Sequence, residues 1–272
     1  MAVYVTGDTH GEWLSRFSSR DFPEGKELTK DDVVIVYGDF GIWRNDSDQK
    51  YKLDWLNNKP FTTAFVCGNH ENYSMLNGDL YQSEKWHGGE IKRIRDKIVY
   101  LKNGNIFDFD NRKFFVFGGA RSHDIQDGIF DPANLTLNSV NAEQELIPMR
   151  HFKSQKEYKL FMKKYVLERK YFRVRNESWW ENEMPTENER HYGKLMLEKT
   201  DNKVDYIVSH DCPSSILAII SMGMFAPDVL SDYFESISQT VEFKHWYFGH
   251  YHKDIRIFDK YSLLYHHIER II

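Results

Sequence analysis

Short apolar runs alternate with polar connectors along the first third of the chain. The runs are Val3–Val5, Val33–Tyr37 and Ala64–Val66, and each is followed by a turn that contains glycine. Because nearly every position of a run is apolar, we expect strands that are covered on both faces. Strands of this kind are typical of a sheet flanked by helices, so the pattern predicts an α/β fold.

Three further apolar runs lie in the middle of the chain, at Ile98–Leu101, Ile106–Phe109 and Phe114–Phe117. Turn-forming residues, Asn103–Asn105 and Asp110–Arg112, separate them, and this spacing predicts an antiparallel meander. Strand-like runs return later, at Val204–Val208, His245–Phe248, Ile255–Phe258 and Leu263–Tyr265.

Between about residue 122 and residue 202 the strand pattern is interrupted, and we predict a mainly helical insertion. Its segment 151–175 looks helical and carries nine Lys and Arg residues. The simplest interpretation of these charges is a solvated helix face, and the alternative is a basic lid that faces a substrate. Since no linker, repeat or change in composition divides the chain, we predict a single domain over residues 1–272.

Composition narrows the classes of partner and compartment. The 36 Lys and Arg residues against 41 Asp and Glu residues give a net charge of −5, which disfavours nucleic acid as a partner. Two cysteines are too few for a disulfide framework in 272 residues, so we expect a reducing, cytoplasmic setting. No apolar run approaches the roughly 20 residues that span a bilayer, and we therefore expect no membrane segment.

The connectors after five predicted strands contain side chains that bind metals. They are Gly7-Asp8-Thr9-His10-Gly11, Gly38-Asp39-Phe40-Gly41, Gly68-Asn69-His70-Glu71, Ser209-His210-Asp211 and Gly249-His250-Tyr251-His252. Taken alone, the Asp-x-His and Gly-Asp segments are ordinary turns and His-x-His could be a partly exposed pair, whereas Gly-Asn-His-Glu is much less common by chance. All five segments after five strands would need five independent coincidences. Loops at the carboxyl ends of strands converge at one edge of an α/β sheet, and we expect a metal site there.

The candidate ligands combine oxygen and nitrogen donors and include no thiolate, which favours Mn, Fe, Zn, Co or Ni. They are Asp8, His10, Asp39, Asn69, His210, His250 and His252. Seven ligands are too many for one ion, whereas one bridging carboxylate would give four protein contacts to each of two ions. Two such ions roughly 3.5 to 4 Å apart can clamp a phosphoryl group and share the attacking hydroxide.

In their order and composition the five segments resemble the motifs of the calcineurin-like metallophosphoesterase superfamily, from Asp8 to His252. The resemblance implies a four-layer sandwich of two mixed β-sheets flanked by helices. It assigns one metal to Asp8, His10 and His252, the bridge to Asp39, and a second metal to Asn69, His210 and His250. The implied cofactors are two divalent transition-metal ions, with Mn, Fe or Zn favoured.

The resemblance also implies a reaction. A hydroxide that bridges the two metals would attack phosphate mono- or diesters, with Asp39 holding both ions and His70 as the general acid for the leaving oxygen. The expected substrate is a phosphorylated small molecule, a nucleotide or a phosphoprotein.

Two alternatives of the same fold stay open: a serine/threonine protein phosphatase and a noncatalytic metal-binding scaffold. The protein phosphatase branch continues its second motif as Gly-Asp-x-Val-Asp-Arg-Gly, whereas this chain has Ile42 at the position of the second aspartate and Trp43 at that of the arginine. A nuclease has less support, because only the basic segment 151–175 could contact a nucleic-acid backbone.

Candidates for substrate binding lie outside the five segments. Arg44, Arg121 and His123 occupy loops that follow predicted strands, and charged forks of this type pair well with phosphate oxygens. For each of them a surface salt bridge is the simpler alternative. Trp179 and Trp180 could form a recognition wall, but paired tryptophans more often anchor a segment to the core.

Overall fold

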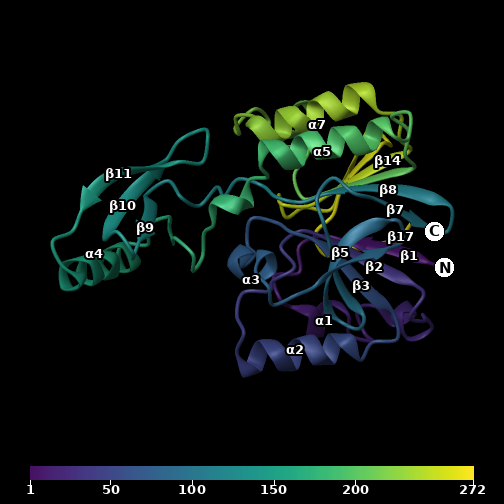
Figure 1. Cartoon of the computed structure of the whole chain (residues 1–272), viewed down its shortest axis with the longest axis horizontal. Coiled ribbons are helices and arrows are strands. Elements are labelled where there is room, and N and C mark those ends of the chain that lie inside the picture. Colours follow the sequence, from purple (N-terminus) through teal and green to yellow (C-terminus); the bar gives the residue numbers. More distant parts are fainter.

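The computed structural model describes residues 1–272 and contains two large mixed sheets (Figure 1). The first has seven strands in the order β17-β1-β2-β3-β6-β5-β4. Its strands are β1 (Val3–Thr6), β2 (Val33–Tyr37), β3 (Thr62–Val66), β4 (Ser83–Trp86), β5 (Gly89–Arg95), β6 (Ile98–Leu101) and β17 (Ile268–Arg270). The four strands β1, β2, β3 and β6 run parallel, and the others are antiparallel to their neighbours.

The second sheet has six strands in the order β15-β16-β14-β13-β8-β7. Its strands are β7 (Ile106–Phe109), β8 (Arg112–Phe117), β13 (Tyr206–Ser209), β14 (His245–Phe248), β15 (Ile255–Ile257) and β16 (Tyr261–Leu263). The inner strands β8, β13, β14 and β16 are parallel, while β7 and β15 are antiparallel edge strands.

Helices accompany both sheets, with α2 near the first and α5 and α7 near the second in Figure 1. The helices are α1 (Trp13–Arg16), α2 (Ser47–Asn57), α3 (Tyr73–Asn77), α4 (Gln155–Leu167), α5 (Glu187–Glu198), α6 (Ser214–Ile220) and α7 (Val229–Thr240), with 3-10 turns η1 (Pro23–Lys26) and η2 (Glu181–Glu183). Side chains fix where several of them begin: Asp46 accepts a hydrogen bond from Gln49 N, and Thr186 and Glu189 form a capping box.

Side chains from both sheets form a common hydrophobic cluster of 17 buried residues, including Val5 and Ile35 from the first sheet and Val116 and Val208 from the second. Clusters of 19 and 20 buried residues lie between the sheets and their helices. The predicted α/β class with mixed sheets is confirmed, and the four-layer order of the sandwich stays a prediction.

The predicted meander is wrong at its first strand. β6 pairs with β3 and β5 in the first sheet, whereas β7 and β8 form an antiparallel hairpin in the second. All four residues of β6 are buried, which is the pattern of a central strand, and the turn around Gly104 carries the chain from one sheet to the other.

The helices predicted for the insertion are present as α4 and α5, but the insertion also contains an unpredicted four-stranded sheet in the order β11-β10-β9-β12, so it is mixed rather than mainly helical. Its strands are β9 (Gly128–Asp131), β10 (Thr136–Val140), β11 (Leu146–His151) and β12 (Phe172–Val174). Helix α4 covers only the middle of the predicted helical segment, and Tyr158 is its one buried residue. Figure 1 shows this part of the insertion extending away from the two large sheets.

None of the helices has the length and apolar character needed to cross a membrane.

Candidate active site

The candidate metal ligands lie at the carboxyl ends of neighbouring parallel strands. Asp8 follows β1, Asp39 follows β2 and Asn69 follows β3 in the first sheet. In the second sheet His210 follows β13, and His250 and His252 follow β14. Strand pairing holds these ends rigidly, and the loops bring their side chains together at one edge.

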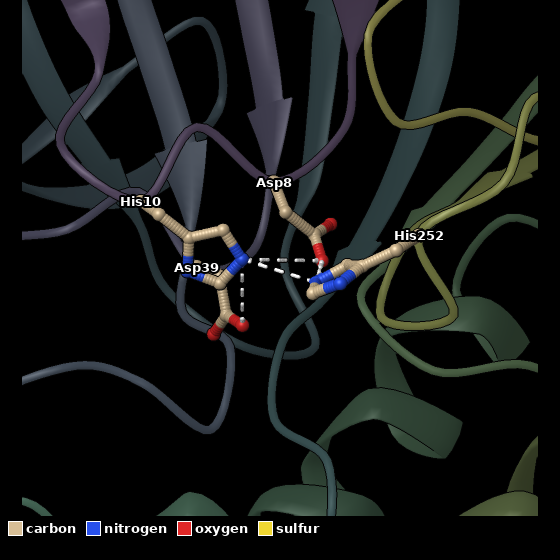
Figure 2. Close-up of side chains that lie close together, drawn as sticks. All are labelled: Asp8, His10, Asp39 and His252. Atoms are coloured by element: carbon tan, nitrogen blue, oxygen red, sulfur yellow. Dashed lines mark hydrogen bonds and ion pairs between the residues drawn. The ribbon is translucent and has the colours of Figure 1, made fainter.

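Four of these side chains form one compact cluster, shown in Figure 2. The ligand atoms of Asp8, His10, Asp39 and His252 all lie within 4.8 Å of one another. His252 Nε2 is 3.1 Å from Asp8 Oδ2 and 3.0 Å from His10 Nε2, and His10 Nε2 is 3.8 Å from Asp39 Oδ2. Two imidazoles and two carboxylates that converge in this way form a suitable donor set for a transition-metal ion.

A second group of ligands faces the other oxygen of Asp39. His210 Nε2 lies 3.5 Å from Asp39 Oδ1 and 3.3 Å from Asn69 Oδ1. His210 Nδ1 lies 2.9 Å from the carbonyl oxygen of Tyr37 and donates to it, which leaves the Nε2 lone pair directed at the site. Asp39 therefore lies between the two groups, with Oδ2 toward one and Oδ1 toward the other.

The surroundings of His250 indicate that a cation fits the second group of ligands. Its Nε2 atom is buried and has no hydrogen-bond partner, and its ring centroid is 5.0 Å from that of His210. A buried polar atom without a partner is costly, and coordination of a metal would satisfy it. The donors of the second group are nitrogen and oxygen atoms, and they fit Mn, Fe or Zn.

Four of the ligand residues have left-handed backbone, which side chains other than glycine rarely adopt. The φ angles are 46° at His10, 44° at Asp39, 70° at His250 and 49° at His252. Such strain persists only where the surrounding structure imposes it, and it gathers at functional sites. Gly68 contributes space, since a Cβ atom there would collide with Asp39 Oδ1.

Burial and neighbouring charges keep two of the ligands, Asp8 and His250, in forms that bind cations. Burial acts to raise the pKa of Asp8, but the imidazoles of His210, His252 and His10 outweigh it and the pKa is lowered. For His250, burial and the nearby histidines hold the pKa well below its usual range. A carboxylate that stays ionised and an imidazole that stays neutral are both ready to coordinate a metal.

His70 lies beside this cluster rather than within it. Its backbone N–H donates to Asp39 Oδ1 at 2.8 Å, and its ring centroid is 5.6 Å from that of His10. Burial, which outweighs the effect of Asp39, lowers the pKa of His70, so the ring is neutral near pH 7. A cavity of about 250 Å³ opens beside it, lined by His10, Trp43, Arg44, His70, Arg173, Glu177, Ser178 and Trp180.

Sequence reasoning did not single out Arg173 as a site residue. It belongs to β12 of the insertion, and its Nη2 atom lies 3.3 Å from His70 Nε2 while its Nε donates to Asp124 Oδ1 at 2.9 Å. The only signal in the sequence was the basic character of segment 151–175, which marks nine residues equally.

The three predicted substrate-binding residues have different positions. Arg44 lines the same cavity as His70, with a side chain that is 78% exposed. The ring of His123 lies 4.7 Å from that of His250 and stacks on Phe225. Arg121 is not brought to the metal cluster: its guanidinium donates to the carbonyl oxygen of Asn141, and it lines a separate cavity of about 780 Å³.

The paired tryptophans are buried, as expected of anchors. Trp179 is fully buried, and Trp180 is 3% exposed and donates from Nε1 to Ser74 Oγ at 2.9 Å. Trp180 thereby attaches the insertion to α3 next to the cavity.

Comparisons with known proteins match this chain to a family. The model of the calcineurin-like phosphoesterase family matches residues 1–254. Lariat debranching enzyme A of Xenopus laevis is 27% identical over 169 residues, which are 56% of this chain and 30% of that protein. Lariat debranching enzyme of Danio rerio is 30% identical over 159 residues, 52% of this chain and 26% of that protein.

The chain thus spans less than a third of the length of these curated relatives. Among solved structures, phosphopantetheinyl hydrolase from Mycobacterium tuberculosis aligns with 97% of this chain and 89% of its own, with a TM-score of 0.40 and 15% identity. The family model covers nearly the whole chain, so the predicted resemblance is confirmed: this chain belongs to the calcineurin-like phosphoesterase family.

Proposed function

We propose that this protein is a dinuclear-metal-dependent phosphoesterase that hydrolyses phosphate mono- or diesters. The observation that carries the proposal is the position of Asp39, whose two carboxylate oxygens face two separate groups of ligands. A bridging carboxylate of this kind places two ions close enough to act on one phosphoryl group.

One ion would be held by Asp8, His10, Asp39 and His252, and the other by Asp39, Asn69, His210 and His250. Mn, Fe or Zn fits these donors. Such a pair supplies Lewis-acid chemistry and an activated water for attack on phosphorus.

The remaining roles belong to side chains beside the metal cluster. His70 is held by Asp39 with its ring toward the cavity, and once protonated, which its lowered pKa disfavours near pH 7, the ring can give a proton to the leaving oxygen. Arg173 and Arg44 line the same cavity, and their guanidinium groups can pair with phosphate oxygens. Because His123 lies against His250, it can contact the substrate from the other side of the cluster.

A nucleotide phosphodiester is the substrate that one further observation favours. Trp43 is 40% exposed at the cavity, yet its indole is fixed by a 2.6 Å hydrogen bond from Nε1 to the carbonyl oxygen of His70. An aromatic face held open beside the site can stack on a base. The names of the two lariat debranching relatives agree with this class of substrate.

The protein phosphatase alternative has less support. Ile42 occupies the position where that branch has an aspartate, and it is fully buried in the hydrophobic core beneath the site. In this chain the side chain next to His70 Nε2 is that of Arg173, whose Nη2 atom lies 3.3 Å away.

Both cysteines, Cys67 and Cys212, are free and buried, which supports the proposal of a reducing, cytoplasmic compartment.

Elemental analysis of the purified protein, followed by an assay with added Mn²⁺, tests the proposal. We expect about two transition-metal ions per chain and hydrolysis of p-nitrophenyl phosphate, of bis-p-nitrophenyl phosphate or of both. The preference between the two substrates separates a monoesterase from a diesterase. Two bound metals with no turnover of these substrates or of a nucleotide panel would favour the scaffold, and no metal after reconstitution would refute the site.

A further inference from the structure

A buried chain of hydrogen bonds connects the insertion to Asn69. Asn69 Nδ2 donates to Ser122 Oγ at 3.2 Å, and Ser122 Oγ lies 2.6 Å from Glu183 Oε2. The other carboxylate oxygen of Glu183 accepts from Ser122 N at 2.9 Å and from Trp179 Nε1 at 3.1 Å. Glu183 belongs to η2 in the insertion and is fully buried.

The direction of these hydrogen bonds decides which end of the Asn69 amide faces the metals. Burial raises the pKa of Glu183 to about 8, against the hydrogen bonds that it accepts from Ser122 and Trp179. Above that pH Glu183 is a carboxylate, and the 2.6 Å contact is then the Ser122 hydroxyl donating to it, which engages the single proton of Ser122. Ser122 Oγ then presents only lone pairs to Asn69 and can accept only from Nδ2. Asn69 Oδ1 is thereby turned toward His210, where it can coordinate the second metal ion.

We propose that Glu183 is a positioning residue for the second metal ion: through Ser122 it selects the amide orientation in which Asn69 presents oxygen. This proposal rests on the proposed function, because it takes Asn69 as a metal ligand. Removing the acceptor at Glu183 frees the Ser122 proton, and Ser122 can then donate to Oδ1 and turn the amide nitrogen toward the site.

Glu183 also has a structural role, and the experiment must separate the two. Its backbone carbonyl accepts from Ala120 N at 3.1 Å, and its side chain anchors Trp179. If the role of Glu183 were purely structural, loss of any one of its hydrogen bonds would have the same effect on Mn²⁺ binding. The positioning role makes only the bonds toward Ser122 affect the metal.

The variants are Glu183→Gln and Ser122→Ala, and the measurement is Mn²⁺ binding to the full chain by equilibrium dialysis. Glutamine keeps an acceptor for Trp179 but can present an N–H to Ser122 in place of a lone pair. We expect the wild type to bind two Mn²⁺ ions, and each variant to bind one of them about 10- to 100-fold more weakly with the other unchanged.

Three controls sharpen the result. Trp179→Phe removes a different donor from the same carboxylate, so it should lower thermal stability while leaving Mn²⁺ affinity unchanged. Ser122→Thr retains the hydroxyl and should bind like the wild type. In an Asn69→Asp background both ends of the side chain are oxygens, so Glu183→Gln should weaken binding less than it does with Asn69 in place.

Unchanged affinity at both sites in Glu183→Gln and Ser122→Ala would overturn the proposal. Equal weakening by Trp179→Phe would overturn it as well, because Glu183 would then act only as an anchor. A wild-type protein that binds fewer than two Mn²⁺ ions would refute the proposed function itself, and that outcome is visible before any variant is made.

Discussion

His70 and Asp39 are joined by a backbone hydrogen bond, so the residue proposed as general acid is fixed to the residue proposed as bridge. The residue types and strand-end positions of the ligands could be predicted because five short segments carried them in order. The orientation of the Asn69 amide could not, because it depends on Ser122 and Glu183, which are 53 and 114 positions away in the chain.

His70→Ala should retain both metal ions and lose turnover by about 100- to 10,000-fold, since general acid catalysis typically contributes that much. The loss should be smallest for substrates whose leaving group, such as nitrophenolate, needs no proton. Metal content and kcat for a series of aryl phosphates give the measurement. An equal loss for all leaving groups would show that His70 positions the substrate instead.

At the scale of elements, continuous apolar runs made β2, β3 and β14 predictable, because strands buried on both faces have few polar positions. The strands of the insertion were missed for the opposite reason. β11 contains Pro148 and is almost wholly exposed, and β12 has only three residues. Arg173 could not be assigned to the site without knowing that β12 pairs with β9.

Arg173→Ala should lower kcat/KM by about 10- to 100-fold, the value of one hydrogen bond to a charged group. Arg175→Ala is the matched control. Arg175 is a neighbour in sequence with similar burial, but it pairs with Asp131 and Glu181 and does not line the cavity near His70. Similar losses for both variants would mean that the insertion, and not the Arg173 guanidinium, supports the reaction.

Asp131 is expected to make the stability of the insertion depend on pH. Burial acts to raise its pKa, but hydrogen bonds from Arg175, Asn134 and Ala133 outweigh burial and lower it. A lowered pKa contributes stability above the usual pKa of aspartate, and this contribution fades as the pH falls through the lowered value.

Asp131→Asn should therefore destabilise the metal-free protein at pH 7 and differ less from the wild type at pH 3. Urea unfolding at the two pH values measures this. A difference that is the same at both would show that the charge of Asp131 contributes no stability.

At the scale of the whole molecule, the proposed metal site depends on both large sheets. Asp8 and Asp39 follow strands of the first, and His210 and His252 follow strands or loops of the second. An ion held by both groups binds only the folded arrangement, so its binding energy adds to the stability of the fold.

Mn²⁺ at 100 times its dissociation constant should raise the melting temperature by about 5 to 10 °C per site, because binding at that concentration adds about 2.7 kcal/mol to the free energy of unfolding. A chelator should reverse the shift. Asp39→Asn should abolish most of it together with turnover, because the bridge contacts both ligand groups. A full shift and full activity in Asp39→Asn would contradict the bridging role.

The pairing of β17 with β1 places the two ends of the described chain side by side, with Ile271 N donating to the carbonyl oxygen of Val3. Figure 1 shows both ends on the side of the molecule away from the insertion. Residues 1 and 2 precede β1, whereas Asp8 follows its other end. A surface or fluorophore attached to this chain at either end would thus leave the ligand edge open during substrate screening.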